Sequence, residues 1–182
     1  MIKNWDIIKS KNILSNKIFS IRTDTCLSPI NGSEYDFYIV EAPDWINVVA
    51  ITEDDQVVLI EQYRHGSESV TLEIPGGMVD PGEEPMETAK RELLEETGYA
   101  GENWVKIGEV FPNPAMQNNK CHMFLVTNCK KVGDTNFDTT EFIETFTRPS
   151  SDIPSLLTEG KITHSLVVAA FYYSHLHKDL NV

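Results

Sequence analysis

The segment Gly77–Tyr99 decides the fold, and it reads GMVDPGEEPMETAKRELLEETGY. Residues 85–97 within it predict an α-helix, because Pro85 suits the first helical turn and Gly98 suits the position just past the last turn. Apolar side chains recur at helical spacing and form one stripe: Met86, Ala89 and Leu93. The segment therefore predicts a glycine-rich loop that runs into an amphipathic helix.

Acidic residues gather at the C-terminal end of this helix. Glu95 and Glu96 follow Glu92 by three and four residues, so the three carboxylates share one side. Like charges at these spacings repel by roughly a few tenths of a kcal/mol per pair, and the last helical turn disfavours anions. Arg91 offsets part of this charge, with Glu87 and Glu95 as its i−4 and i+4 neighbours. The cluster predicts a bound cation such as Mg²⁺, and a solvated acidic face is the alternative.

The loop before the helix favours the metal site. Gly76 and Gly77 permit a close approach of the backbone, and Asp80-Pro81-Gly82 predicts a turn. Glu83 follows that turn and can reach back toward the helix. A Walker lysine loop is absent from the sequence, which excludes P-loop chemistry. A glycine-rich turn that leads into an acidic helix suits a complex of metal ions with a diphosphate.

Composition and charge limit the classes of partner. The 182 residues carry a formal net charge of −13, which disfavours long nucleic acids as ligands. The three cysteines have no zinc spacing, and the N-terminus has no apolar signal segment. The longest apolar stretch, 166–173, is too short to span a membrane. We therefore expect a cytoplasmic protein that binds a small-molecule nucleotide and associates with neither long nucleic acid nor membrane.

The order of the expected elements indicates an α/β (α+β) fold with a mixed central sheet. Strands 18–27 and 35–40 flank the turn at Asn31-Gly32 and predict an N-terminal β-hairpin. Further apolar runs predict the remaining strands and a last helix: strands 45–52, 56–63, 71–74, 104–110, 122–127 and 142–147, and helix 163–177. We divide the chain into an N-terminal β region, 1–42, which we expect to pack on a partner subunit, and a main domain, 43–182.

The specified positions of the acidic segment have the spacing G-x5-E-x7-R-E-U-x-E-E-x-G-U, where U is a bulky apolar residue. This spacing resembles the Nudix box, and it departs from the box only at Tyr99, where an aliphatic residue is usual. The resemblance implies an α/β/α sandwich in which the box forms a loop–helix–loop. It further implies that Mg²⁺, for which Mn²⁺ could substitute, is bound by four groups: the carbonyl of Gly76 and the carboxylates of Glu92, Glu95 and Glu96. Arg91 and Glu83 would pair and brace the loop.

Residues outside the box resemble one branch of this family. The stretches PDWINVVAITEDDQVVLIEQYRHG and LEIPGG look like the ADP-ribose pyrophosphatase branch, in which the arginine that matches Arg64 contacts substrate. A proline about 16 residues after the last box glycine marks the branch, and Pro114 stands at that distance from Gly98. The resemblance also implies a homodimer. Trp45 could stack on the base of a nucleotide.

The expected reaction is metal-dependent hydrolysis of a nucleoside diphosphate sugar, with ADP-ribose as the leading candidate, to a nucleoside monophosphate and a sugar phosphate. Glu92 and Glu96 would act in catalysis through the metal ions. Glu141 is the preferred general base, and Glu144 or a box glutamate is the alternative. In some relatives the base lies two residues before the position of Glu141, and this chain has Thr139 there.

Two other functions remain open from the sequence. The first is a Nudix hydrolase of nucleoside triphosphates or capped RNA ends, which the net acidity disfavours for RNA. The second is a regulator that binds a nucleotide without cleaving it. Such a regulator would tolerate a broken box, whereas every charged and glycine position of the box is intact here.

Overall fold

Helix α1 spans Pro85–Thr97, the range that its sequence predicts, in a computed structural model that describes residues 1–137 and 142–180. Gly98 ends the helix in the left-handed conformation, with φ of 71°, and its N–H donates to the carbonyl of Leu94. Glycine adopts this conformation without the steric penalty of a Cβ atom, which explains the sharp stop.

The chain forms two compact units. The first consists of Met1–Pro43 and Phe111–Lys120, and the second of Asp44–Val110 and Cys121–Val182. The second unit holds one eight-stranded sheet with β4 (Trp45–Thr52) near its centre, parallel to β10 (Cys121–Lys131). The other pairings in this sheet are antiparallel. They involve β5 (Gln56–Arg64), β6 (Ser69–Glu73), β7 (Gly76–Met78), β8 (Tyr99–Ala100), β9 (Asn103–Val110) and β11 (Ile143–Pro149).

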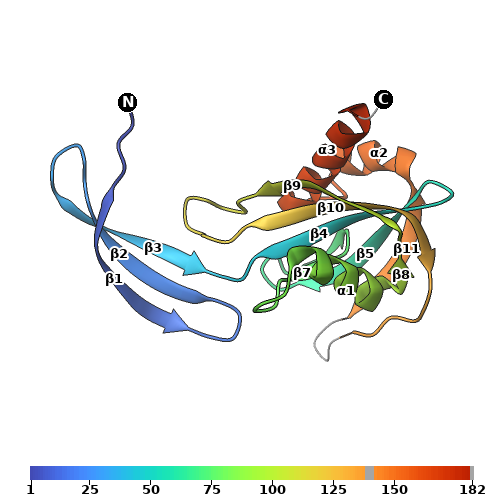
Figure 1. Cartoon of the computed structure of the whole chain (residues 1–182), viewed down its shortest axis with the longest axis horizontal. Coiled ribbons are helices and arrows are strands. Elements are labelled where there is room, and N and C mark those ends of the chain that lie inside the picture. Colours follow the sequence, from blue (N-terminus) through green and yellow to red (C-terminus); the bar gives the residue numbers. More distant parts are fainter. Residues whose placement is uncertain (138–141, 181–182) are drawn as a thin grey trace. The chain divides into compact units, whose positions relative to one another are not determined.

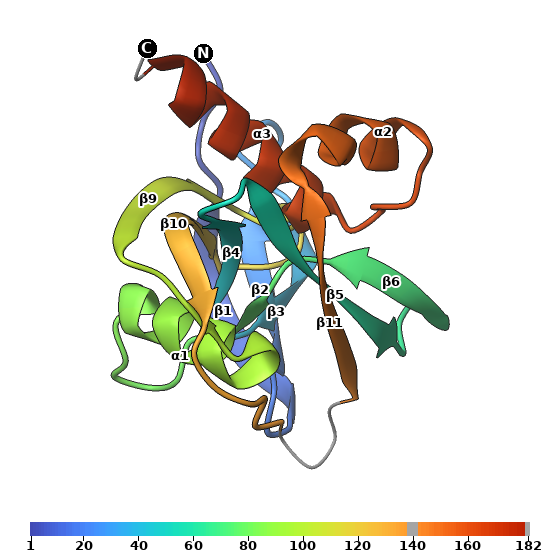
Figure 2. The same cartoon turned by 90° about the vertical axis from the view of Figure 1, so that its right-hand side faces the viewer.

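Helices cover both faces of this sheet, so the second unit is an α/β/α sandwich (Figure 1). Alternate residues of β4 point to opposite faces. Ile46 and Val48 pack with Leu93 of α1, whereas Val49 packs with Phe171 of α3 (Ser165–Leu180). Figure 2 shows α3 and the short helix α2 (Ile153–Thr158) on one side and α1 on the other. A 3₁₀ turn, η1 (Ser150–Asp152), precedes α2.

The first unit contains a three-stranded antiparallel sheet in the order β1-β2-β3. Its strands are β1 (Asp6–Ser15), β2 (Ser20–Leu27) and β3 (Glu34–Glu41). All ten residues of β1 are exposed. The loop 111–120 packs with this unit through an N–H···O bond of 2.8 Å from Val40 to the carbonyl of Met116.

The structure confirms the predicted α/β class and the mixed central sheet, and it adds elements that the sequence analysis missed. The predicted hairpin is present as β2 and β3, but β1 extends it to three strands. The additional short elements are β7, β8, η1 and α2. Within the described residues, no helix is long and apolar enough to cross a membrane.

Candidate active site

The loop before α1 runs so close to the helix and to β4 that a Cβ atom at either of two positions would meet neighbouring atoms. Strand β7 pairs with the start of β4, which places Gly77 opposite Ile46 and Gly76 opposite Asn47. A Cβ atom on Gly77 would lie 2.3 Å from Oε1 of Glu92, and one on Gly76 would lie 2.5 Å from the carbonyl oxygen of Ile46. The absence of a side chain at Gly77 therefore leaves room for the Glu92 carboxylate, and its absence at Gly76 lets the backbone lie against β4.

Glu96 is a buried carboxylate in this site, with 3% of its surface exposed. The backbone N–H of Gly76 donates to its Oε2 at 3.0 Å. The hydroxyl of Thr145 on β11 donates to the backbone carbonyl of Glu96 at 2.9 Å. Because burial of a carboxylate is costly unless donors or cations compensate it, these contacts hold Glu96 at a defined place between the glycine strand and β11.

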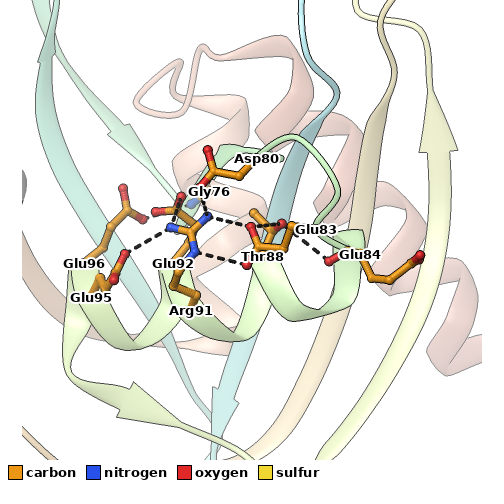
Figure 3. A network of polar contacts seen from close by, with 9 residues as sticks. All are labelled: Gly76, Asp80, Glu83, Glu84, Thr88, Arg91, Glu92, Glu95 and Glu96. Atoms are coloured by element: carbon orange, nitrogen blue, oxygen red, sulfur yellow. Dashed lines mark hydrogen bonds and ion pairs between the residues drawn. The ribbon is translucent and has the colours of Figure 1, made fainter.

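Arg91 is the cation at the centre of the acidic cluster (Figure 3). Its Nη1 lies 2.9 Å from Oε1 of Glu92 and 3.1 Å from Oε2 of Glu95. Its Nη2 and Nε donate to the two oxygens of Glu83 at 3.0 and 3.2 Å. Hydrogen bonds to Glu83 outweigh burial and raise the pKa of the Arg91 guanidinium above its usual value. Of the two helical neighbours of Arg91, Glu95 forms an ion pair with it, and Glu87 forms one with Lys90 at 2.8 Å.

Glu83 links the loop to the first turns of α1. Besides Arg91, it accepts a hydrogen bond of 2.8 Å from the hydroxyl of Thr88 (Figure 3). The bonds from Arg91 and then Thr88 hold the pKa of the Glu83 carboxyl below its usual value. The carboxylate form is therefore the one that fits this loop.

The residues present suit a divalent cation. Arg91 Nη1 lies within 3.1 Å of oxygens of both Glu92 and Glu95, so these two carboxylates can reach one positive group. Within residues 1–137 and 142–180, no three acidic, histidine or cysteine side chains already converge as a ligand set. Arg91 contacts oxygens of Glu92 and Glu95, and the N–H of Gly76 contacts an oxygen of Glu96. Carboxylates are the donors that hard divalent ions prefer.

Arg64, predicted to contact substrate, ends β5 on the same sheet. Its Nε and Nη2 donate to the two oxygens of Glu73 at 2.8 and 2.7 Å. Its side chain is 42% exposed, whereas that of Glu73 is 3% exposed. The contact of Arg64 with substrate remains a prediction. The ion pair with Glu73 holds the Arg64 guanidinium in place.

The remaining predicted site residues lie away from α1 in the chain, on strands β4 and β11, in the loop 111–120 or outside the described residues. Trp45 begins β4 opposite Met78, and Pro114 lies in the loop that packs with the N-terminal unit, so both substrate contacts remain predictions. Glu141 lies outside the described residues, as does Thr139. Glu144 precedes Thr145 on β11 and is exposed. Successive strand residues point to opposite faces, and Thr145 reaches α1, so Glu144 points away from the carboxylate helix.

Sequence reasoning missed the contacts of three residues: Glu73, Thr88 and Thr145. Glu73 stands inside the LEIPGG stretch, but its partner Arg64 is nine residues away and reaches it only through the β5–β6 pairing. Thr145 contacts Glu96 across 49 residues. Thr88 offered a local signal, because it follows Glu83 by five residues at the start of a predicted helix.

The family model described as the NUDIX domain matches residues 43–170. The chain belongs to the Nudix family. This range covers α1, with its acidic face, and all eight strands of the sheet that supports it. Nudix hydrolases generally need a divalent metal ion, which agrees with the carboxylate donors on α1.

Relatives match the chain over nearly its whole length. The methanol dehydrogenase activator of Bacillus methanolicus is 31% identical over 95% of this chain and 94% of its own. The ADP-ribose pyrophosphatase of Bacillus subtilis (strain 168) is 29% identical over the same shares. A crystal structure of an ADP compounds hydrolase superimposes with a TM-score of 0.87 over 100% of this chain and 97% of that one. At 20% identity, that likeness establishes the fold.

Proposed function

We propose that this protein is a metal-dependent pyrophosphohydrolase that cleaves the diphosphate of nucleoside diphosphate sugars, with ADP-ribose as the leading substrate. The observation that carries the proposal is the carboxylate face of α1, where Glu92, Glu95 and Glu96 stand beside the glycine strand Gly76–Gly77. The relative from Bacillus subtilis, an ADP-ribose pyrophosphatase, supports the choice of substrate class.

Mg²⁺ is the proposed metal, and Mn²⁺ is a possible substitute. The groups that would hold it are the carbonyl of Gly76 and the carboxylates of Glu92, Glu95 and Glu96. When bound, the metal neutralises the charge of the diphosphate and lowers the pKa of water. Glu92, Glu95 and Glu96 supply carboxylate oxygens on one side of α1, and Mg²⁺ commonly combines one or two such groups with phosphate oxygens and water.

The chain's own residues then position these groups. Arg91 carries positive charge into the cluster and, through Glu83, ties the carboxylates to the loop. The N–H of Gly76 holds one oxygen of Glu96. Such supporting contacts orient the groups that bind a metal and a substrate, so most of the acceleration would come from positioning and electrostatics.

Glu141 remains the preferred general base, with a box glutamate as the alternative. Glu144 is the weaker candidate, because the strand geometry directs it away from α1. A Glu141→Gln variant tests this preference: its kcat should fall about 100-fold if Glu141 is the base. An unchanged kcat would indicate that a glutamate of the Nudix box is the general base instead.

The direct experiment incubates the protein and Mg²⁺ with ADP-ribose, other nucleoside diphosphate sugars and nucleoside triphosphates, and identifies the products by chromatography. AMP and ribose 5-phosphate from ADP-ribose are the expected products. Cleavage of triphosphates or capped RNA alone would replace this function with the first alternative. Binding without cleavage of any of them would make the protein a nucleotide-binding regulator.

A homodimer that forms through the N-terminal region is the second part of the proposal. Strand β1 exposes large apolar side chains along its length: Ile7, Ile8, Ile13 and Leu14, each 48–58% exposed. Strand β1 is also an edge of its sheet, whereas β3, the other edge strand, is bridged to the loop 111–120 at Val40. An apolar surface and an unpaired strand edge, both present at β1, are typical of a surface that a partner covers.

Light scattering tests the oligomeric state. The expected mass is twice the 20.6 kDa of one chain, and Leu14→Glu should reduce it to that of one chain. A wild-type mass of one chain would reject the dimer. For location we propose the cytoplasm, since the three cysteines are free and buried, as suits a reducing compartment.

A further inference from the structure

The strongest side-chain cluster outside the carboxylate face lies on the hairpin of β5 and β6. Arg64 and Glu73 form two parallel hydrogen bonds there, of 2.8 and 2.7 Å. This two-point pairing fixes the plane of the guanidinium as well as its position. The pair uses Nε and Nη2, so the Nη1 edge of Arg64 points away from the Glu73 carboxylate.

The surroundings of the buried Glu73 side chain favour its charged, carboxylate form. Only 3% of its side chain is exposed, and the hydroxyl of Thr71 donates to its Oε1 at 2.6 Å. Burial would raise the pKa of the Glu73 carboxyl, but the bonds from Arg64 and Thr71 outweigh burial and hold that pKa below its usual value. An ion pair between the buried Glu73 and the half-exposed Arg64 is expected to add little to stability. Stability alone therefore does not explain its two-point geometry.

A third ionisable group stands close to this pair. The charges of Glu73 and Arg64 both act on His164, which directly precedes α3. Burial lowers the pKa of the His164 imidazole, and Glu73 and Arg64 act on it in opposite directions. Burial therefore favours the neutral form of His164 beside the Arg64–Glu73 pair.

A short rigid connection joins Glu73 to the carboxylate helix. Ile74 is buried, and the carbonyl of Pro75 accepts a hydrogen bond of 2.8 Å from the N–H of Val48. Gly76 follows and donates to Glu96. Two residues along the chain, Ile74 and Pro75, thus separate the anchor of Arg64 from Gly76, whose N–H holds the Glu96 carboxylate.

We propose that Glu73 is a positioning residue that holds the Arg64 guanidinium with its Nη1 edge toward the diphosphate of the bound substrate. This inference rests on the proposed function. Arginine binds phosphate oxygens through paired N–H groups, and a guanidinium whose other edge is fixed by a buried carboxylate loses less conformational freedom when substrate binds.

A double-mutant cycle tests the proposal with Glu73→Gln, Arg64→Ala and the double variant. We expect Glu73→Gln to raise KM for ADP-ribose about tenfold, as expected for the loss of a charged hydrogen-bond partner, with a smaller change in kcat. The Kd of α,β-methylene ADP-ribose, which is not hydrolysed, should rise by the same factor. Because Glu73 acts through Arg64, the double variant should bind no more weakly than Arg64→Ala alone.

Glu61→Gln is the matched control, since Glu61 stands on β5 beside Ile60, the residue opposite Glu73, and points to the other face. It should leave KM unchanged. If Glu73→Gln is unfolded at the assay temperature, Arg64→Lys replaces it, because that change is made at a half-exposed side chain and removes the two-point pairing.

The possible outcomes separate this inference from the proposed function. A wild-type protein that neither cleaves nor binds any nucleoside diphosphate sugar overturns both. A wild-type protein that cleaves ADP-ribose, with KM and Kd unaltered in Glu73→Gln, overturns the positioning role alone. Additive losses in the double variant would also overturn it, since they would mean that Glu73 acts independently of Arg64.

Discussion

Helices α1 and α3 cover opposite faces of one sheet, yet their buried residues differ in kind. Three of the five buried residues of α1 are polar, and one is the carboxylate of Glu96. Helix α3 buries mainly apolar side chains, among them Val167, Ala170 and Phe171. The comparison indicates that the α3 face supplies stability, whereas the α1 face gives up stability to hold charges close together.

Glu96→Gln should show the largest difference between the roles of the two faces, because it should lower activity without lowering stability. It keeps the shape of the side chain and an acceptor for Gly76, but it removes one negative charge. We expect kcat to fall at least about 100-fold. The melting temperature should stay level or rise, because repulsion among the three glutamates decreases. An unchanged kcat in the presence of Mg²⁺ would mean that the carboxylates of α1 take no part in the reaction.

The converse change on the other face is Phe171→Ala. Phe171 is 8% exposed and packs in the core with Val49, so its truncation should lower the free energy of unfolding by about 3 kcal/mol. Urea denaturation measures this loss. At a temperature where the variant is folded, kcat should match the wild type, and a loss as large as that of Glu96→Gln would contradict the division of roles.

Glu83→Gln sharpens the comparison within the α1 face. The substitution weakens the paired hydrogen bonds to Arg91, which supports Glu92 and Glu95. We expect about a tenfold weaker apparent affinity for Mg²⁺ in the activity assay. Glu87→Gln is the matched control, because Glu87 is an exposed carboxylate of the same helix that pairs with Lys90. Equal effects of the two changes would argue against a supporting role for the Glu83–Arg91 pair.

The smallest expected effect is a dependence of stability on pH. The pKa of the Glu83 carboxyl lies below its usual 4.5 in the folded protein. Its stabilising contribution is therefore fully present above about pH 4.5 and is lost as pH falls through the lower folded-state value. The difference in free energy of unfolding between wild type and Glu83→Gln should shrink as urea titrations move from pH 7 to pH 3. A constant difference would show that the pairing does not depend on the charge of Glu83.

Local signals explain which elements the sequence predicts well. Strand β4 and helix α1 occupy the predicted ranges, because the apolar run of β4 is continuous and α1 has Pro85 and Gly98 at its ends. Strand β1 escaped prediction because all of its residues are exposed in the chain, so no buried face imposes a pattern of period two. Its partner is β2, and pairing with β2 rather than burial defines it.

The site divides in the same way between local and distant contacts. The carboxylates of α1 could be recognised because helical spacing brings Glu92, Glu95 and Glu96 to one side. The anchor of Arg64 could not, because Glu73 reaches it only across the β5–β6 pairing. The partners of Arg91 are a mixed case: Glu95 follows from spacing, but Glu83 depends on how the loop folds back.

Direct measurement of metal binding tests the central claim, that the α1 face is a divalent-cation site. Mn²⁺ is paramagnetic, so its free concentration can be followed by electron paramagnetic resonance as protein is added. We predict that the wild-type protein and Phe171→Ala bind Mn²⁺ alike, and that Glu96→Gln binds it at least about tenfold more weakly. Equal Mn²⁺ affinity in the wild type and Glu96→Gln would contradict the claim.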